Sequence, residues 1–280
     1  MIQSKVNDPL LLQEISMEIR RSVIITLSRA GSGHLGASLG LADLFTCLYF
    51  SVLEHDPADP LWPGRDRLIL SIGHVAPLLY TTLARCGYFP EQELGTLRKL
   101  GSRLQGHPDR EYGLPGLELS AGSLGQGLSV SVGRALAARM DDHSWRVFCI
   151  LGDGELQEGS VWEAAMAAAH LKLHNLIAIV DRNGVQIDGK TEEVMALEPL
   201  KEKWKAFGWK VVECDGNNHQ DILTSIHLVQ QGPDKPGVIL AYTKMGKGVS
   251  SIQGDYRWHG KAPTKREAAQ FVRELEEENS

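Results

Sequence analysis

Leu151-Gly152-Asp153-Gly154-Glu155 closes an apolar run that starts at Arg146, and a second apolar run, from Asn175 to Val180, leads into Asp181-Arg182-Asn183-Gly184-Val185. Between these runs, residues 160–173 carry apolar side chains at helical spacing. The order is therefore strand, helix, strand, and its length suits a crossover between two parallel strands. This unit predicts an α/β fold built on a parallel sheet.

The residues that follow the two strands suit a cation and a phosphate. Ligands of open parallel sheets bind beyond the carboxyl ends of the strands, so we expect Asp153 and Asn183 to face one crevice. Their side-chain oxygens and the backbone carbonyl of Val185 are hard donors, suited to magnesium or calcium. Gly152 and Gly154 leave the backbone open to a phosphate, and the next helix presents free N–H groups. The crevice is thus predicted to hold a metal-bridged diphosphate.

The rest of the chain extends this pattern. Strands alternate with helices from residue 146 to 243, which predicts a doubly wound parallel sheet with helices on both faces. We expect a single domain over residues 1–280, with a helical segment over 10–53 and a C-terminal helix over 265–278. The other predicted elements are helices at 10–30, 41–53, 90–100, 128–140, 200–207 and 221–231, a helix that ends near Cys86, and strands at 67–71, 210–214 and 237–242.

Composition narrows the classes of function. The net charge of −6 argues against nucleic acid as the main partner. No stretch approaches the length of a membrane span, and the first eight residues lack the pattern of a signal peptide, so a cytoplasmic location is expected. The four cysteines are scattered, with no Cys-x-x-Cys pair, which favours reduced thiols in the core.

A Gly-rich segment near the N-terminus offers an alternative cofactor. Gly31-Ser32-Gly33-His34-Leu35-Gly36 matches the G-x-G-x-x-G dinucleotide fingerprint. Residues 23–27 could form the strand that this fingerprint requires, and Glu54 or Asp56 could bind a ribose. Helical spacing nevertheless runs through residues 12 to 23, and no second strand precedes the acid, so the pattern favours a loop after a helix.

Four histidines share one kind of neighbourhood. His34, His74, His107 and His259 each adjoin a glycine in a predicted loop. One histidine of this kind is usually a surface or hydrogen-bonded residue, but four together suggest a shared site. Imidazoles suit a site that moves protons near neutral pH and binds phosphate oxygens.

Gly-Asp-Gly alone also occurs in ordinary strand-to-helix turns, but with Asn183 it resembles the binding motif of thiamine-diphosphate enzymes. Further motifs follow in the order found in transketolases. The chain resembles the N-terminal, diphosphate-binding half of a transketolase, made as a separate subunit. The motifs are Ser32-Gly-His-Leu-Gly-Ala37, Asp66-Arg-Leu-Ile-Leu-Ser-Ile-Gly-His74, Gly106-His107-Pro108, Gly122-Ser-Leu-Gly-Gln-Gly127, Gly152-Asp-Gly154 and Trp258-His259-Gly260.

This resemblance implies a thiamine-diphosphate-binding fold and a set of cofactor ligands. Asp153, Asn183 and the carbonyl of Val185 would hold Mg²⁺, for which Ca²⁺ or Mn²⁺ could substitute. The residues implied to contact the diphosphate are His74, Gly154 and His259.

The resemblance also assigns the other parts of the site. Gly122 and Leu124 would meet the aminopyrimidine through backbone groups, and Ser123 between them stands where full-length enzymes usually have proline. Glu158 matches an acid at the subunit interface, and we count it with Ser123 among the cofactor-binding residues. The residues implied to line the substrate channel and transfer protons are His34, His107 and His259.

The implied activity is transfer of a two-carbon ketol unit between sugar phosphates. It implies a partner chain with the pyrimidine-binding half, in an α2β2 assembly, because the sheet motifs end near Tyr242 and too few residues follow His259 for that half. Three alternatives stay open: the alpha subunit of a 2-oxoacid decarboxylase-dehydrogenase, a deoxyxylulose-phosphate-synthase-like enzyme, and a non-catalytic binding subunit. His34 and the Trp258-His259-Gly260 motif argue against the first.

Overall fold

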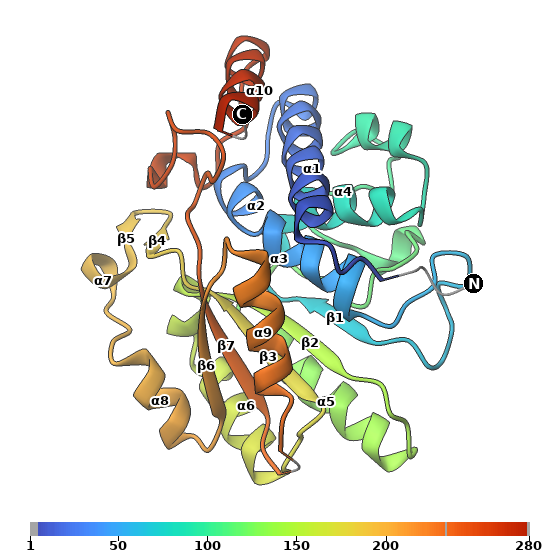
Figure 1. The fold of residues 1–280 in the computed structure, drawn as a ribbon, viewed down its shortest axis with the longest axis vertical. Helices are drawn as coiled ribbons and strands as arrows, with labels where there is room; N and C mark the ends of the chain where they lie inside the picture. The colour runs from blue at the N-terminus through green and yellow to red at the C-terminus, as the bar shows by residue number, and fades with distance from the viewer. Residues whose placement is uncertain (1–4, 233, 279–280) are drawn as a thin grey trace.

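A five-stranded parallel sheet forms the centre of the computed structural model, which describes residues 5–232 and 234–278. Its strand order is β1-β2-β3-β7-β6 (Figure 1). The register places Gly152 opposite Asp181, so the loops that leave β2 and β3 begin side by side. The strands are β1 (Arg67–Leu70), β2 (Val147–Gly152), β3 (Leu176–Asp181), β6 (Lys210–Asp215) and β7 (Gly237–Tyr242).

Helices cover both faces of the sheet, as predicted. Alternate side chains of a strand enter different cores: Phe148 and Ile150 of β2 join one, while Cys149 and Leu151 join the other. The first core includes α1 (Pro9–Ala30), α3 (Ala42–Cys47), α4 (Ala76–Cys86) and α9 (His219–Val229). The second includes α5 (Gly127–Met140), α6 (Gly159–His170) and α8 (Leu200–Ala206).

The long helix α1 decides between the two interpretations of the Gly-rich segment. Its N-cap Asp8 accepts a hydrogen bond from the backbone of Leu10, and Pro9 lies in its first turn. It continues without a break to Ala30 and ends at Gly31, whose φ of 71° is left-handed. The residues before the G-x-G-x-x-G pattern are therefore helical, and the dinucleotide-binding alternative is wrong.

Two predicted helices differ in detail. The predicted helix 41–53 is present, because α3 continues without a break into a π-helical turn at Leu48–Val52, but a separate short helix, α2 (Gly36–Gly40), precedes it and was not predicted. Of the predicted helix 90–100, only a 3₁₀ segment at Glu91–Thr96 exists. Its interior Gly95 and the left-handed backbone of Arg98 (φ 60°) explain why the helix stops.

A small hairpin beside the sheet was not predicted. It consists of β4 (Val185–Gln186) and β5 (Gly189–Lys190), which pair antiparallel, and α7 (Thr191–Val194) follows it directly. Short 3₁₀ helices occur at Gly73–Val75, Arg110–Tyr112, Gly154–Gln157 and Tyr256–Trp258. The C-terminal helix α10 (Lys265–Glu278) lies beside α1 (Figure 1).

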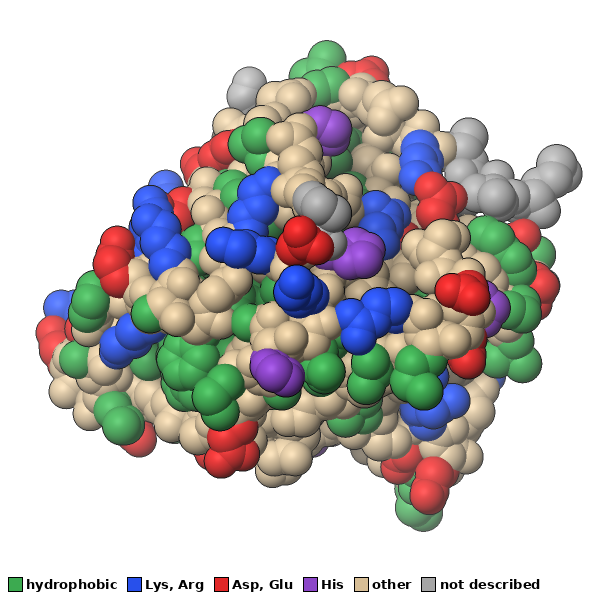
Figure 2. All heavy atoms as spheres, turned by 90° about the horizontal axis from the view of Figure 1, so that it is seen from below, with side chains coloured by type: hydrophobic (Ala, Val, Ile, Leu, Met, Phe, Trp, Pro, Cys, Tyr) green, Lys and Arg blue, Asp and Glu red, His purple; other side chains and the backbone are tan. Residues whose placement is uncertain are grey.

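The cysteines lie in the core, as expected from their scattered positions in the sequence. All four cysteines are buried and unpaired. Figure 2 shows the side at which the strands begin, where acidic and basic side chains are interspersed. No helix within the described parts of the chain is long and apolar enough to cross a membrane.

Candidate active site

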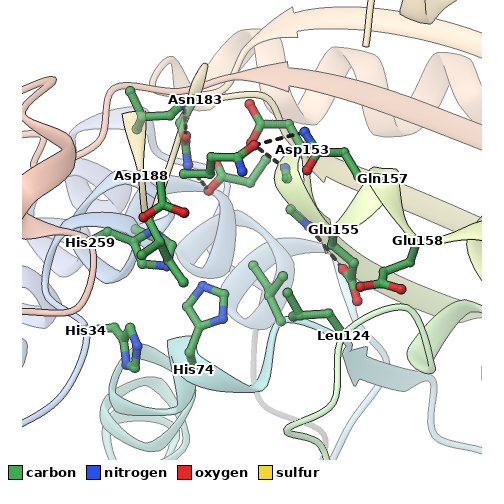
Figure 3. Close-up of a pocket in the computed structure, with 18 of the residues that line it drawn as sticks. His34, His74, Leu124, Asp153, Glu155, Gln157, Glu158, Asn183, Asp188 and His259 are labelled. Atoms are coloured by element: carbon green, nitrogen blue, oxygen red, sulfur yellow. Dashed lines mark hydrogen bonds between the residues drawn. The ribbon is translucent and has the colours of Figure 1, made fainter. Parts of the chain in front are cut away.

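A cavity of about 380 Å³ lies beyond the carboxyl ends of β1, β2 and β3. In Figure 3, His34, His74 and His259 gather at one side of it, and Asp153 and Asn183 lie at another. The lining residues are His34, Ala37, Ile72, His74, His107, Gly122, Leu124, Gly152, Asp153, Gly154, Glu155, Gln157, Glu158, Asp181, Asn183, Val185, Gln186, Ile187, Asp188 and His259.

Asp153 is held in place by hydrogen bonds to both carboxylate oxygens. Oδ1 accepts from the backbone N–H of Gly154 (2.7 Å), and Oδ2 accepts from the N–H of Gly184 (2.7 Å) and from Nη1 of Arg182 (3.0 Å). The side chain is only 2 % exposed. Burial raises the pKa of Asp153, and these hydrogen bonds offset part of that effect. The carboxylate is therefore fixed at the cavity wall.

Asn183 lies at the same side of the cavity as Asp153, and two neighbours set its orientation. Its Nδ2 donates to Oδ2 of Asp181 (2.8 Å), and its Oδ1 accepts from the N–H of Val185 (3.0 Å). Asp181 is buried and also accepts from the hydroxyl of Thr243. Burial, with the nearby charge of Asp153, raises the pKa of Asp181 to about 7.

Glu155 joins three segments beneath the cavity. Its Oε1 accepts from the hydroxyl of Ser71 and from the N–H of Gly125 (2.7 Å). Its Oε2 accepts from the N–H of Gly152 (3.2 Å). The side chain is 2 % exposed, and burial raises its pKa. Because β1, β2 and the loop before α5 all donate to this one carboxylate, Glu155 fixes their relative positions.

The four candidate histidines come together around His34. Its ring centroid lies 5.0 Å from that of His74, 5.7 Å from that of His259 and 6.4 Å from that of His107. The rings of His74 and His259 are also 5.0 Å apart. These residues come from four separate segments of the chain, so the cluster is a product of the tertiary fold.

These imidazoles are kept uncharged by their surroundings. Burial and the neighbouring histidines lower the pKa of His34 to about 4 and that of His74 to about 3. Burial also lowers the pKa values of His107 and His259. Among the described residues, Nδ1 of His34 and Nδ1 of His259 are buried and have no hydrogen-bond partner. Such atoms suit a site that a ligand completes.

Comparison with known proteins places this geometry in a family. Residues 12–278 match the model of the family described as transketolase, thiamine diphosphate binding domain. The chain belongs to the transketolase family. It is 42 % identical over 258 residues to an apulose-4-phosphate transketolase subunit of Phocaeicola vulgatus, with 92 % of this chain and 91 % of that protein covered. It is also 42 % identical over 269 residues to a 6-deoxy-6-sulfo-D-fructose transketolase subunit of a Clostridium species, with 96 % and 98 % covered.

Solved transketolases share the fold. The Campylobacter jejuni enzyme superposes with a TM-score of 0.90 at 32 % identity, over 96 % of this chain. This chain spans 43 % of the length of that transketolase chain. The parallel sheet with helices on both faces is thus the thiamine-diphosphate-binding α/β fold of transketolases, as the motifs implied.

The structure brings most of the predicted site residues into one cavity. Gly122, Leu124 and the exposed Glu158 line it, together with the candidate metal ligands and all four histidines. Ser123 is exposed and does not contribute to the lining, although both of its neighbours do. Of the site residues that the resemblance implied, Ser123 is the one that does not line the cavity.

Several cavity residues were missed. Ile187 and Asp188 line the cavity from the β4–β5 hairpin, which could not be predicted from periodicity because its strands have two residues each. No role was predicted for Glu155, which lines the cavity, or for Arg182, which holds Asp153 from outside the lining. Both are charged residues next to a predicted ligand, in a segment that leaves a buried strand. That position could have indicated a role in the site.

Proposed function

We propose that this chain is the diphosphate-binding subunit of a thiamine-diphosphate-dependent transketolase, which transfers a two-carbon ketol group between a ketose and an aldose phosphate. The observation that carries the proposal is the single cavity in which Asp153, Asn183 and four uncharged histidines converge. Membership of the transketolase family supports the same reaction. The 2-oxoacid and deoxyxylulose alternatives have no comparable support.

The residues present fit a diphosphate bridged by Mg²⁺. Asp153, Asn183 and the carbonyl of Val185 offer carboxylate, amide and backbone oxygens, the donors that Mg²⁺ prefers and that Ca²⁺ or Mn²⁺ also accept. Among the described residues no three His, Cys, Asp or Glu side chains form a metal cluster, so part of the coordination shell would come from the diphosphate and water. His74, His259 and the backbone of Gly154 would bind the diphosphate oxygens.

The other lining residues would orient the cofactor's rings. Leu124 and Gly122 would contact the aminopyrimidine through backbone groups, and Ser123 would support that loop. Glu158, exposed at the cavity edge, would act where a partner chain closes the site. When bound, thiamine diphosphate supplies a thiazolium carbon that can carry the two-carbon unit.

The histidines would handle protons at the substrate end. His34, whose pKa of about 4 leaves it neutral at neutral pH, can accept a proton or a hydrogen bond from a sugar hydroxyl. His107 is exposed at the cavity mouth and His259 lies beside His34, so both can reach the same substrate. We propose these three as the catalytic residues.

The proposed partner is a second chain with the pyrimidine-binding half. Three of the relatives are themselves named as transketolase subunits, which implies at least one further chain in each of those enzymes. An α2β2 assembly in the cytoplasm would serve this function. Two relatives that are each 42 % identical to this chain are named for different sugars. The ketose that this chain uses as donor is therefore to be determined by assay.

A ketol-transfer assay tests the proposal. The chain is purified with a candidate partner chain, thiamine diphosphate and Mg²⁺, and is offered xylulose 5-phosphate, apulose 4-phosphate or 6-deoxy-6-sulfofructose with an aldose phosphate acceptor. Release of the carbonyl compound shortened by two carbons, which is an aldose from an unbranched donor and a ketone from the branched apulose 4-phosphate, is expected for at least one donor, with formation of the extended ketose. The same mixture is also offered pyruvate, and decarboxylation of this 2-oxoacid without ketol transfer from any of the three donors would overturn the proposal.

A further inference from the structure

Arg98 adopts a backbone conformation that non-glycine residues rarely use. Its φ is 60°, in the left-handed region. Its backbone N–H donates to the carbonyl of Leu104 (2.9 Å), which closes the loop between them. Left-handed backbone at a residue with a long side chain is unfavourable, and it persists where the surroundings require it.

The guanidinium lies between the segments that carry two of the candidate histidines. A Cβ atom at Gly106 would lie 2.9 Å from Cζ of Arg98, and Nη2 donates to the carbonyl of Gly106 (3.4 Å). A Cβ atom at Gly33 would lie 3.8 Å from Nε. Gly33 immediately precedes His34, and Gly106 immediately precedes His107. The Arg98 side chain therefore packs closely against the His107 loop and lies beside the His34 loop, which Leu27 also contacts at Gly33 (2.5 Å from a Cβ there).

The charge of this guanidinium is not neutralised locally. Among the described residues no carboxylate forms an ion pair with Arg98, and its buried Nε has no hydrogen-bond partner. Arginine stays protonated at all relevant pH values. Burial is the main cause of the lowered pKa of His107, and the Arg98 cation is the second. For His34, the Arg98 cation is the third cause, after burial and the neighbouring His259.

Arg98 lowers the pKa values of only two of the four clustered histidines, His34 and His107. Burial alone lowers the pKa of His259, while burial and the other three histidines lower that of His74. The charged or titratable groups that face His34 are these histidines and Arg98, and the acids on the same cavity wall include Asp153 and Asp188.

We propose that Arg98 is a positioning residue, which sets the spacing of the His34 and His107 loops. Its charge beside both rings adds to the burial that disfavours their protonated forms. It acts through these two residues and makes no contact with the metal ligands. Neutral rings are what a proton acceptor at the substrate end of the cavity requires. The role in turnover rests on the proposed function, but the effect on the two histidines does not.

Titration of the histidines by NMR in the full chain tests the electrostatic part. In Arg98→Met, the pKa values of His34 and His107 should both rise measurably, as expected for loss of a nearby like charge. In Arg98→Lys, which keeps the charge, they should stay within a few tenths of a unit of the wild type. His259 serves as the internal control and should not move. Unchanged values for His34 and His107 in Arg98→Met would overturn the proposal.

A double-mutant cycle tests the positional part. Gly106→Ala alone should lower the Tm by about two degrees, because the new methyl group would lie 2.9 Å from Cζ and the guanidinium would have to shift. In an Arg98→Ala background the same substitution should cost less than about one degree, since Gly106 does not have a positive φ. Equal losses in both backgrounds would show that Arg98 does not space the His107 loop.

The pH profile of turnover links both parts to the reaction. With partner and cofactor present, the acid limb of the kcat profile should move to higher pH in Arg98→Met and return to its wild-type position in Arg98→Lys. A limb that stays in place in Arg98→Met would overturn the role in turnover. If the wild type lacks ketol-transfer activity, the proposed function fails, while the NMR titration and the double-mutant cycle still decide the role of Arg98.

Discussion

Asp153 accepts hydrogen bonds at both carboxylate oxygens and still lines the cavity, so its position is set before any ligand arrives. The predicted site depended on this residue and on Asn183, and both lie where the ends of parallel strands require them. Their hydrogen-bond partners could not be predicted, since Arg182 and Gly184 reach Asp153 only through the folded turn after β3.

Asp153→Asn keeps the shape of the side chain and removes its charge. Thiamine-diphosphate binding in the presence of Mg²⁺ should weaken by about 100-fold or more, because Asp153 is the only anionic group among the three proposed metal ligands. Calorimetry on the assembled enzyme measures this. Asp188→Asn is the matched control, as it removes a charge from the same cavity. An equal loss in both variants would mean that only the cavity's net charge matters.

His34 and His74 should make the protein sensitive to acid. Both have folded-state pKa values, about 4 and about 3, below the value of 6.5 expected in the unfolded chain. Between these pKa values the unfolded state binds more protons than the folded state. The contribution of these histidines to the free energy of unfolding is therefore fully present above pH 6.5 and is lost as the pH falls toward 4.

Urea denaturation at pH 7 and pH 4.5 measures this loss. His34→Gln should reduce the difference between the two pH values by about 2 kcal/mol. The surface variant His143→Gln is the control and should leave the difference unchanged, because residue 143 is exposed. A wild-type stability that is flat from pH 7 to pH 4.5 would contradict the buried, uncharged state of the cluster.

At the scale of elements, the hairpin and α7 depend on one buried side chain. Arg182 donates to Asp153, to Glu192 of α7 (2.7 Å) and to Glu198 (3.1 Å). It thereby ties the end of β3 to the segment that carries Ile187 and Asp188 into the cavity. Periodicity can predict long helices and buried strands, but a hairpin of this size is stabilised by such contacts and leaves no periodic signal.

Arg182→Met should loosen this segment and destabilise the fold. Removal of one member of a buried ion pair costs about 3 kcal/mol, because Asp153 is left without its partner. Hydrogen exchange of residues 185–198 should become faster, and the midpoint of urea denaturation should fall. Lys190→Met is the control in the same hairpin, because its pair with Glu193 is exposed and contributes less than about 1 kcal/mol. An unchanged rate of hydrogen exchange for residues 185–198 in Arg182→Met would show that Arg182 does not hold this segment in place.

The C-terminal helix α10 supports the segment that carries His259. Phe271 of α10 is buried, and its ring packs edge-on against Trp258 at 5.1 Å between centroids. Phe271→Ala should lower the free energy of unfolding by about 3–5 kcal/mol and should shift the NMR signals of His259. Phe271→Leu, which keeps most of the volume, should cost about 1 kcal/mol. A large loss of stability with His259 unmoved would limit α10 to a role in stability.

At the scale of the whole molecule, the order of elements was predicted well, because long apolar runs and helical spacing are independent of distant contacts. The convergence of four histidine loops on one point was not predictable from spacing. It depends on strands that are neighbours in the sheet but distant in sequence, as with β3 and β7. The family motifs supplied that information, since they occur in a fixed order in a fold that is already known.

The proposed function predicts that this chain is inactive without a second protein. The chain spans 43 % of the length of the Campylobacter jejuni transketolase, and Glu158 and Ile187 are exposed at the cavity edge, where another surface could close the site. Ketol transfer by the purified chain with thiamine diphosphate and Mg²⁺ should be at background, and addition of the partner chain should restore it. Sedimentation of the mixture should give the mass of two copies of each chain. Full activity from this polypeptide alone would refute the two-chain proposal, whereas activity in a mixture that sediments as one copy of each chain would refute only the α2β2 assembly.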